Sequence, residues 1–271
     1  MKTNGKKVFI SADIEGVAGL TVWEEARQQD SQYIQMARQM GFEVAAACRG
    51  AEAAGAQTIL VKDSHASGRN IDAYLLPKNV ELIRGWYGDP YTMISGIDET
   101  FDALLFVGYH DIAGGEGNPT AHTINSSKVA SIELNGQLVG EFHLEAYAAA
   151  YLGVPAVFLS GDAAICERAK DFLPGIHTVA TKYGIGEGTR SIGPQLAIER
   201  IEEQVQKALE ADLSTCLIEL PEKFTIRVYY RYHYDAHRNS HYPGTRKISP
   251  TGIEYSNANY YEILRFLMFV I

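Results

Sequence analysis

Short apolar segments alternate with longer segments of helical periodicity along most of the chain. Apolar runs typical of buried strands occur at 8–12, 57–61, 80–83, 103–108, 155–160, 178–181 and 225–230. Apolar residues spaced by three and four predict helices at 31–54, 142–152, 163–173, 192–211 and 260–270. Strands that alternate with helices favour a mostly parallel sheet with helices on both faces. The pattern therefore predicts an α/β protein with three layers, α/β/α.

One pair of strands is expected to be antiparallel. Asn135-Gly136 separates two strand-like segments, 131–134 and 137–139, and this dipeptide favours a two-residue hairpin turn. The predicted sheet is therefore mixed. Beyond residue 212 the chain becomes rich in tyrosine. We expect a main α/β domain at 1–212 that carries the chemistry, and a smaller C-terminal subdomain at 213–271 packed on it.

Composition narrows the class of protein. Hydrophobic residues make up 46% of the 271 residues, and the net charge is -9 with no basic stripe, so we expect a globular protein that does not bind nucleic acid. There is no apolar run of transmembrane length and no signal-peptide core near the N-terminus, so no membrane association is expected. Cys48, Cys166 and Cys216 are scattered, which predicts no disulfide framework and a cytoplasmic location.

Metal-ligand types recur where the predicted strands end. Asp13 and Glu15 follow the first strand, His65 follows the second, and His110 follows the strand at 103–108. Any one of these residues is more often a helix cap or a turn residue than a ligand. Ligands of open α/β sheets bind at the carboxyl ends of the strands, so the recurrence at one edge strengthens the metal interpretation.

Glu141 supplies a third carboxylate, although a helix N-terminus favours an acidic residue even without a ligand. Two histidines and three carboxylates are too many for one tetrahedral zinc and suit two metal ions that share a carboxylate. Asp13 is the natural bridge, because it is short and lies closest to the strand end. Such a pair of ions suits amide hydrolysis, and the ligand types fit zinc, manganese or cobalt.

His122 follows a loop that contains Gly114, Gly115 and Gly117. It is either a loop histidine that bonds to the backbone, or an acid–base or oxyanion-stabilising residue that faces the metals. The glycines lack the lysine and serine of a phosphate-binding loop, so they suit a mobile flap over the site.

Three further features near strand ends are weaker signals of function. Residues 184–188 have the wrong glycine spacing for a dinucleotide site, and we interpret them as a flexible loop. Lys182 either contacts a substrate carboxylate or is solvated. Asp162 is expected to cap the following helix rather than to bind metal.

A histidine-rich segment lies near the C-terminus. His233, His237 and His241 are spaced by four, as on one face of a helix. The intervening tyrosines and the following Pro243-Gly244 argue against a helix, so we do not expect a second metal site there.

The candidate motifs occur together in the order of a known family. Ser-x-Asp-x-Glu-Gly, Asp-Ser-His, Gly-Tyr-His, a later His in a glycine-rich loop and Val-Gly-Glu follow one another here. The sequence resembles the DppA-type D-aminopeptidases, the M55 metallopeptidase family. The resemblance continues through Val154-Pro155 and Ser160-Gly161-Asp162, and it is weakest in the final third of the chain.

The resemblance implies two zinc ions per chain and five ligands for them: Asp13, Glu15, His65, His110 and Glu141. Asp13 would bridge the ions, and His122 would be the catalytic histidine. It also implies removal of N-terminal D-amino acids from short peptides, and a homo-oligomer of ten subunits whose sites face an inner chamber.

The sequence differs from the family pattern in two places. The loop between His110 and His122 is about one residue longer, and 229–241 is rich in Tyr and His. Both features bear on the substrate pocket, and therefore on the preference for D-residues.

Two other functions are compatible with the same residues. A dinuclear metallohydrolase of another amide or of a phosphoester uses the same ligand types. A non-catalytic peptide-binding protein needs no metal, and so many ionisable groups at one sheet edge argue against it. A zinc-dependent aminopeptidase is therefore the favoured hypothesis.

Overall fold

The computed structural model describes residues 5–271. The prediction that the N-terminal segment is no signal peptide falls partly on the first four residues, which lie outside that range. Its centre is a seven-stranded sheet of order β3-β2-β1-β4-β7-β8-β9. The strands are β1 (Lys6–Ala12), β2 (Ala56–Asp63), β3 (Val80–Ile83), β4 (Ala103–Tyr109), β7 (Ala156–Asp162), β8 (His177–Ile185) and β9 (Gly188–Ser191). All neighbours pair in parallel except β8 and β9, so the predicted mixed, mostly parallel sheet is confirmed.

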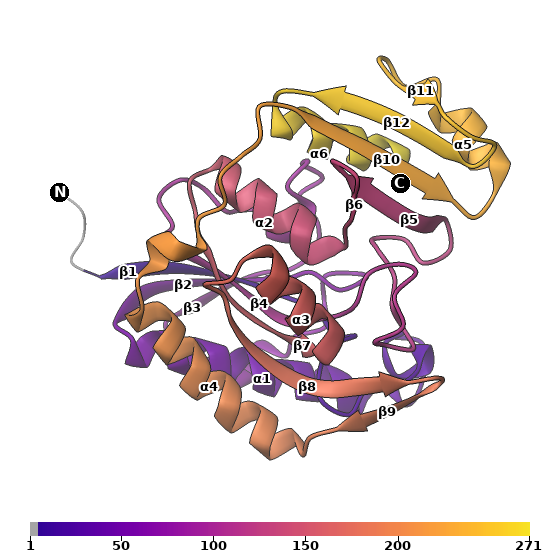
Figure 1. Cartoon of the computed structure of the whole chain (residues 1–271). Coiled ribbons are helices and arrows are strands. Elements are labelled where there is room, and N and C mark those ends of the chain that lie inside the picture. The colour runs from indigo at the N-terminus through magenta and orange to yellow at the C-terminus, as the bar shows by residue number, and fades with distance from the viewer. Residues whose placement is uncertain (1–4) are drawn as a thin grey trace.

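Helices cover both faces of this sheet (Figure 1). On one face α1 (Tyr33–Ala53) packs against α4 (Pro194–Glu210), and on the other face α2 (Glu141–Tyr151) contacts α3 (Ala163–Phe172). Because both faces are covered, every residue of β4 and β7 is buried. The predicted three-layer α/β/α architecture is confirmed.

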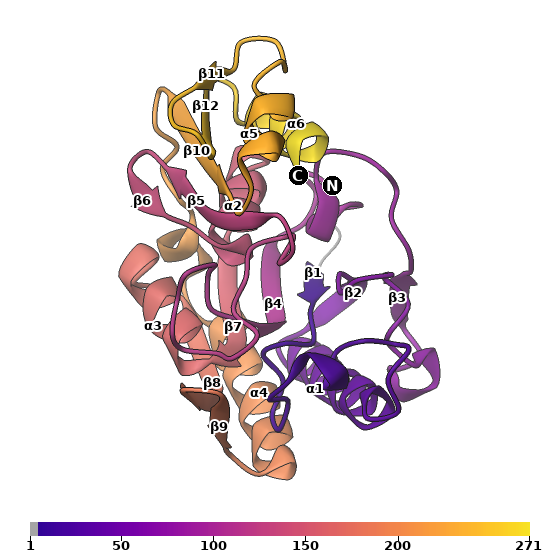
Figure 2. The same ribbon diagram turned by 90° about the vertical axis from the view of Figure 1, so that its right-hand side faces the viewer.

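A second sheet, fully antiparallel, has the order β11-β12-β10-β5-β6. Its strands are β5 (Val129–Leu134), β6 (Gln137–Leu138), β10 (Phe224–Tyr230), β11 (Arg246–Lys247) and β12 (Gly252–Asn257). Helix α6 (Tyr260–Val270) contacts this sheet and also α2 (Figures 1 and 2). The second sheet combines strands from both sides of residue 212, and the domain boundary at that residue stays a prediction.

The predicted hairpin lies in the second sheet, and the main sheet contains a hairpin that was not predicted. The Asn135-Gly136 turn is present, but it joins β5 to β6 in the second sheet. The antiparallel member of the main sheet is β9. The prediction of a flexible loop at 184–188 is wrong. Those residues form the end of a β8–β9 hairpin in which Lys182 pairs with Ser191, so the backbone groups on the facing edges of the two strands bond to each other.

Shorter elements complete the described part of the chain. The segment in which no helix was expected forms α5 (His233–Asn239), with Asp235 in its first turn and Arg238 in its last, as a helix dipole favours. Short 3₁₀ helices are η1 (Trp23–Glu25), η2 (Ala73–Leu75), η3 (Thr92–Ile94) and η4 (Leu213–Cys216). Within residues 5–271, no helix combines the length and the hydropathy that crossing a bilayer requires.

Candidate metal centre

The connections of the main sheet create a crevice at the carboxyl ends of β1 and β4. From β1 the chain moves outward to β2 and β3, then returns to β4 on the other side of β1 and continues to β7 and β8. The loops that leave β1 and β4 therefore diverge to opposite faces, which is where ligands bind in open α/β sheets. The candidate residues lie at this switch point.

Asp13 and Glu15 lie in a tight turn directly after β1. The turn is fastened to the end of β4, because Asp13 N donates to Val107 O at 2.8 Å and Gly16 N donates to Gly108 O at 2.8 Å. A Cβ at Gly16 would lie 1.8 Å from the Tyr109 carbonyl oxygen. The glycine is needed for this close approach of two loops.

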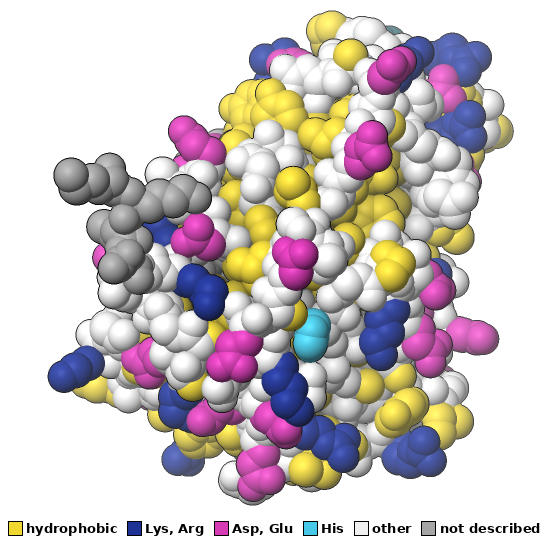
Figure 3. Space-filling model, turned by 60° about the vertical axis from the view of Figure 1, so that its left-hand side comes forward, with side chains coloured by type: hydrophobic (Ala, Val, Ile, Leu, Met, Phe, Trp, Pro, Cys, Tyr) yellow, Lys and Arg dark blue, Asp and Glu magenta, His cyan; other side chains and the backbone are white. Residues whose placement is uncertain are grey.

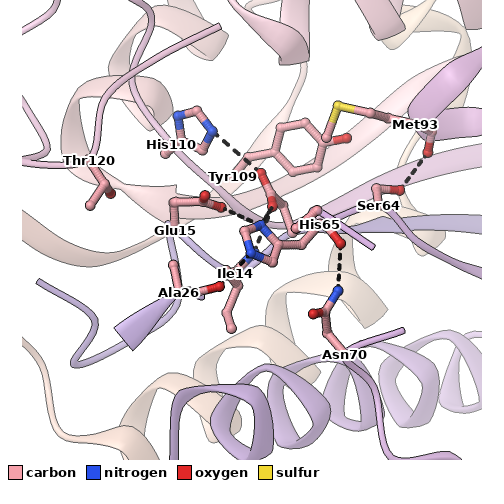
Figure 4. Close-up of polar contacts among 12 residues, drawn as sticks. Ile14, Glu15, Ala26, Ser64, His65, Asn70, Met93, Tyr109, His110 and Thr120 are labelled. Atoms are coloured by element: carbon pink, nitrogen blue, oxygen red, sulfur yellow. Dashed lines mark hydrogen bonds and ion pairs between the residues drawn. The ribbon is translucent and has the colours of Figure 1, made fainter. Parts of the chain in front are cut away.

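His65 presents one ring nitrogen to two carboxylates (Figure 4). Its Nε2 lies 2.7 Å from Ala26 O. A carbonyl oxygen only accepts, so Nε2 carries the proton and Nδ1 carries a lone pair in the neutral ring. That Nδ1 lies 3.2 Å from Asp13 Oδ1 and 3.0 Å from Glu15 Oε2. Three electron-rich atoms therefore face one another in a buried site.

His110 repeats this arrangement on the other side of Asp13. Its Nδ1 donates to Asp111 O at 2.9 Å, which leaves the lone pair on Nε2. Nε2 lies 3.4 Å from Asp13 Oδ2 and 3.2 Å from Glu141 Oε2. His110 Nε2 and Glu15 Oε2 belong to the small set of buried side-chain atoms in residues 5–271 that have no hydrogen-bond partner.

The site therefore consists of two adjoining groups. Ligand atoms of Asp13, Glu15 and His65 lie within 4.8 Å of one another, and so do those of His110, His122 and Glu141. The two carboxylate oxygens of Asp13 face different groups, Oδ1 toward His65 and Oδ2 toward His110. All five predicted metal ligands are thus brought together by loops that follow β1, β2, β4 and β6.

His122 completes the second group. Its ring stacks on that of His110, with centroids 4.3 Å apart and planes at 10°. Nδ1 lies 3.0 Å from Thr120 O, and Nε2 lies 3.6 Å from Glu141 Oε1. Burial and the neighbouring His110 lower the pKa of His122, which favours a neutral ring whose lone pair is on Nε2.

This set of donors fits divalent cations. Burial, together with the charge of Glu15, raises the pKa of Asp13 to about 8, whereas His65 helps to hold the pKa of Glu15 low. Crowded carboxylates that face histidine nitrogens repel one another unless protons or a cation lie between them, and a divalent cation can replace several protons at once. Each histidine is oriented by a backbone carbonyl at its other nitrogen, as is usual for metal-binding histidines.

The motif serines hold the strand ends rather than the candidate ligands. Ser11 Oγ and Ser64 Oγ lie 3.0 Å apart, and both donate to Met93 O at 2.7 Å. Ser11 Oγ also lies 2.8 Å from the hydroxyl of buried Tyr109. Asp63 accepts three hydrogen bonds from Asn70 and Ile71, which fixes the loop behind His65.

A cavity of about 580 Å³ opens above the site. Both tryptophans of the chain, Trp23 and Trp86, line it together with Arg27 and Thr92. Sequence reasoning did not identify these four residues, because they lie in loops or in single-turn 3₁₀ helices with no recognisable spacing. Trp23 is the first aromatic residue after the Asp-x-Glu turn, and this is the only local signal that marks it.

Two weaker sequence signals resolve clearly. Asp162 caps α3 as predicted, since its side chain accepts from Ile165 N at 2.9 Å. Both predictions for Lys182, contact with a substrate carboxylate or exposure to solvent, are wrong. Its side chain is fully buried and donates to the carbonyl oxygens of Glu15 and Leu20. It therefore holds the turn that carries Glu15.

The sequence as a whole matches a known family. The family model described as Peptidase M55, D-aminopeptidase, matches residues 6–269. The chain belongs to this family. Its members are hydrolases, and the resemblance inferred from the motifs is confirmed.

Two relatives support the assignment to the M55 family. A protein named D-aminopeptidase from Bacillus subtilis (strain 168) is 30% identical over 209 residues, which is 75% of this chain and 74% of the relative. A solved structure is described as the Zn-dependent D-aminopeptidase DppA from Bacillus subtilis, a self-compartmentalizing protease. It is 25% identical, matches with a TM-score of 0.91, and the match covers 97% of this chain and 96% of that one.

Proposed function

We propose that this M55 protein is a zinc-dependent aminopeptidase that removes N-terminal D-amino acids from short peptides at a two-metal site. One observation carries the proposal: the ring nitrogens of His65 and His110 that do not contact a backbone carbonyl both face Asp13, each beside a further carboxylate. Zinc is favoured because it accepts imidazole and carboxylate ligands, and because the similar DppA structure is described as Zn-dependent. The preference for D-residues rests on the family description.

The ligands divide between two ions. Glu15 and His65 would hold one ion, His110 and Glu141 the other, and Asp13 would contribute one oxygen to each. When bound, a pair of divalent ions activates water and polarises the scissile carbonyl. Glu141 is also fixed by Ile124 N, which donates to its Oε1 at 2.6 Å.

His122 is the proposed acid–base residue. The hydrogen bond to Thr120 O fixes the tautomer, so that Nε2 is free to accept a proton. The lowered pKa keeps the ring neutral near pH 7, as a general base requires. Nε2 would take a proton from the attacking water and later pass it to the departing amine.

Metal content per chain tests the ligand assignment. We expect two ions in the wild type, one in Glu15→Ala, and almost none in Asp13→Ala, because only Asp13 serves both ions. His122→Asn should keep two ions and lower kcat at least 100-fold. Glu203→Ala, which removes an exposed carboxylate on α4, is the control and should retain both ions. Two ions in Asp13→Ala would refute the bridge, and one ion in His122→Asn would make His122 a ligand.

A substrate panel tests the reaction. Wild-type protein loaded with zinc is expected to hydrolyse D-aminoacyl amides and D-dipeptides faster than their L-counterparts, and a chelator should abolish turnover. Hydrolysis of phosphoesters alone would replace the peptidase proposal with a phosphoesterase. Unchanged peptide affinity in metal-free protein, together with no turnover, would indicate a binding protein.

We also propose that the chain is cytoplasmic and assembles into a decamer. All three cysteines are buried and unpaired, which suits a reducing compartment. The described self-compartmentalization of the similar structure supports a closed homo-oligomer. Short peptides are the substrates that would enter such a chamber readily.

A further inference from the structure

We propose that Arg27 binds the free C-terminal carboxylate of the substrate, so that the enzyme selects unblocked dipeptides and tripeptides. The inference rests on the proposed aminopeptidase function and adds a specificity residue to it. It also reassigns the carboxylate contact that the sequence suggested for Lys182, which is buried and engaged with backbone carbonyls.

The segment that carries Arg27 is attached to the candidate site at two points. Ala26 O accepts the hydrogen bond from His65 Nε2 at 2.7 Å (Figure 4). The Trp23 ring packs edge-to-face on the His122 ring, with centroids 5.2 Å apart. Glu25 closes the turn between them by accepting from Thr21 N at 2.6 Å. Arg27 therefore starts from a backbone fixed relative to both histidines.

The guanidinium of Arg27 is oriented but not neutralised. It lies over the Trp23 ring at 5.4 Å from the centroid, a distance at which a cation and an aromatic face attract each other. Within residues 5–271, no ion pair involves Arg27, and it is the one lysine or arginine that lines the cavity. A planar guanidinium of this kind matches a carboxylate through two parallel hydrogen bonds.

Charge in the cavity is separated in a way that suits a short zwitterion. Asp13, Glu15 and Glu141 are buried lining residues, near which the reacting end of the peptide belongs, whereas Arg27 lines the cavity as an exposed side chain. Trp86 also lines the cavity and packs against the Lys62 ammonium, but that ammonium is buried and donates to Asp63 O. Arg27 is thus the cation that remains for a substrate anion.

The distances set the length of peptide that fits. The guanidinium carbon of Arg27 and the His122 ring centre are each about 5 Å from the Trp23 ring centre, so they are at most about 11 Å apart. A peptide spans at most roughly 3.3–3.6 Å per residue, so three residues cover the upper limit of this distance and two residues cover about 7 Å of it. A longer peptide would place its carboxylate beyond Arg27.

The experiment compares D-alanyl-D-alanine with its C-terminal amide. We expect the wild type to favour the free acid in kcat/KM through a lower KM, and Arg27→Gln to reduce the acid-to-amide ratio about 10- to 100-fold. Arg27→Lys should keep part of the preference, because it retains charge without the planar fork. Arg38→Gln is the matched control, since Arg38 lies over Phe42 at 5.4 Å on α1, away from the cavity, and should leave the ratio unchanged.

A binding measurement separates this inference from the proposed reaction. The probes are the same dipeptide acid and amide with the peptide bond replaced by CH₂–NH, which cannot be hydrolysed. Tryptophan fluorescence reports their binding, because both tryptophans line the cavity. If no substrate is hydrolysed but the acid binds at least 10-fold more tightly than the amide, and Arg27→Gln removes that difference, the reaction fails and this inference stands. Equal affinity of acid and amide for the wild type, or an equal loss for both in Arg27→Gln, overturns it.

Discussion

Two buried histidines of the candidate metal centre owe their orientation to single backbone carbonyl groups. Ala26 O fixes the tautomer of His65, and Asp111 O fixes that of His110. Each ring is left with a lone pair that faces carboxylates at 3.0–3.4 Å. A displacement of either supporting loop would therefore reorient the histidine ring that contacts it and alter the candidate metal centre.

Glu43 is a buried carboxyl group outside the site, and it should make stability depend on pH. Its Oε1 accepts from Ala18 N and Gln39 Nε2, and burial raises its pKa from 4.5 to about 7. The folded protein therefore holds this proton more tightly than the unfolded chain, so stability is lost as pH rises from about 4.5 to 7. We expect Glu43→Gln, which never ionises, to raise the free energy of unfolding at pH 8 by about 1–3 kcal/mol.

Urea unfolding at pH 5 and pH 8 measures this effect. The gain from Glu43→Gln should be clearly larger at pH 8, where the wild type must bury a charge. Glu199→Gln, on the exposed face of α4, should change stability little at either pH. The same gain at both pH values would show that the ionisation of Glu43 does not contribute.

At the scale of elements, the ends of β1 and β4 meet through glycines. Gly108 has φ +75°, and a Cβ there would lie 2.2 Å from Asp13 O. We expect Gly108→Ala to destabilise the fold by more than about 2 kcal/mol and to reduce metal content, because the turn that carries Asp13 must move.

Gly136→Ala is the matched control for this substitution. Gly136 also has a positive φ, +83°, but no atom beyond its chain neighbours lies within 4 Å of the position that a Cβ would occupy. The Gly136→Ala variant should therefore lose only about 1 kcal/mol of stability, from the cost of a positive φ in alanine, and should retain its metals. Chemical denaturation and metal analysis of both variants separate strain from steric clash. Equal losses of stability would contradict the role of close approach.

At the scale of the whole molecule, large apolar side chains are exposed in several places. Ile185 at the end of the β8–β9 hairpin is 68% exposed, and Phe269 of α6 is 66% exposed. Figure 3 shows hydrophobic side chains gathered on one face, with acidic and basic side chains around them. Contiguous apolar surface of this kind is typical of interfaces.

The mass in solution tests self-association. A decamer of 29.9 kDa chains would sediment at about 300 kDa, and this mass should persist at micromolar concentration. High salt should leave it largely intact if burial of apolar surface dominates the interface. A species of about 30 kDa throughout the concentration range would contradict the proposal.

Much of the main sheet could be predicted because its strands are buried on both faces. A strand such as β4, with the sequence Ala-Leu-Leu-Phe-Val-Gly-Tyr, contains no charged residue and therefore favours a position buried on both faces. The β8–β9 hairpin and α5 could not be predicted, because their residues are partly exposed and tolerate several conformations. The destination of the β5–β6 hairpin depends on β10, which lies about 90 residues later in the chain.

The sequence by itself determined the alternation of strands and helices, and it placed Asp13, Glu15, His65, His110 and Glu141 next to strand ends. These conclusions depend only on local periodicity and on the parallel order of the sheet. Only the tertiary structure decided which nitrogen of each histidine faces the carboxylates, that Asp13 lies between two groups, and that Trp23 and Arg27 join the cavity wall. Such relations depend on hydrogen bonds and packing between segments far apart in the chain, and local sequence patterns do not predict these contacts.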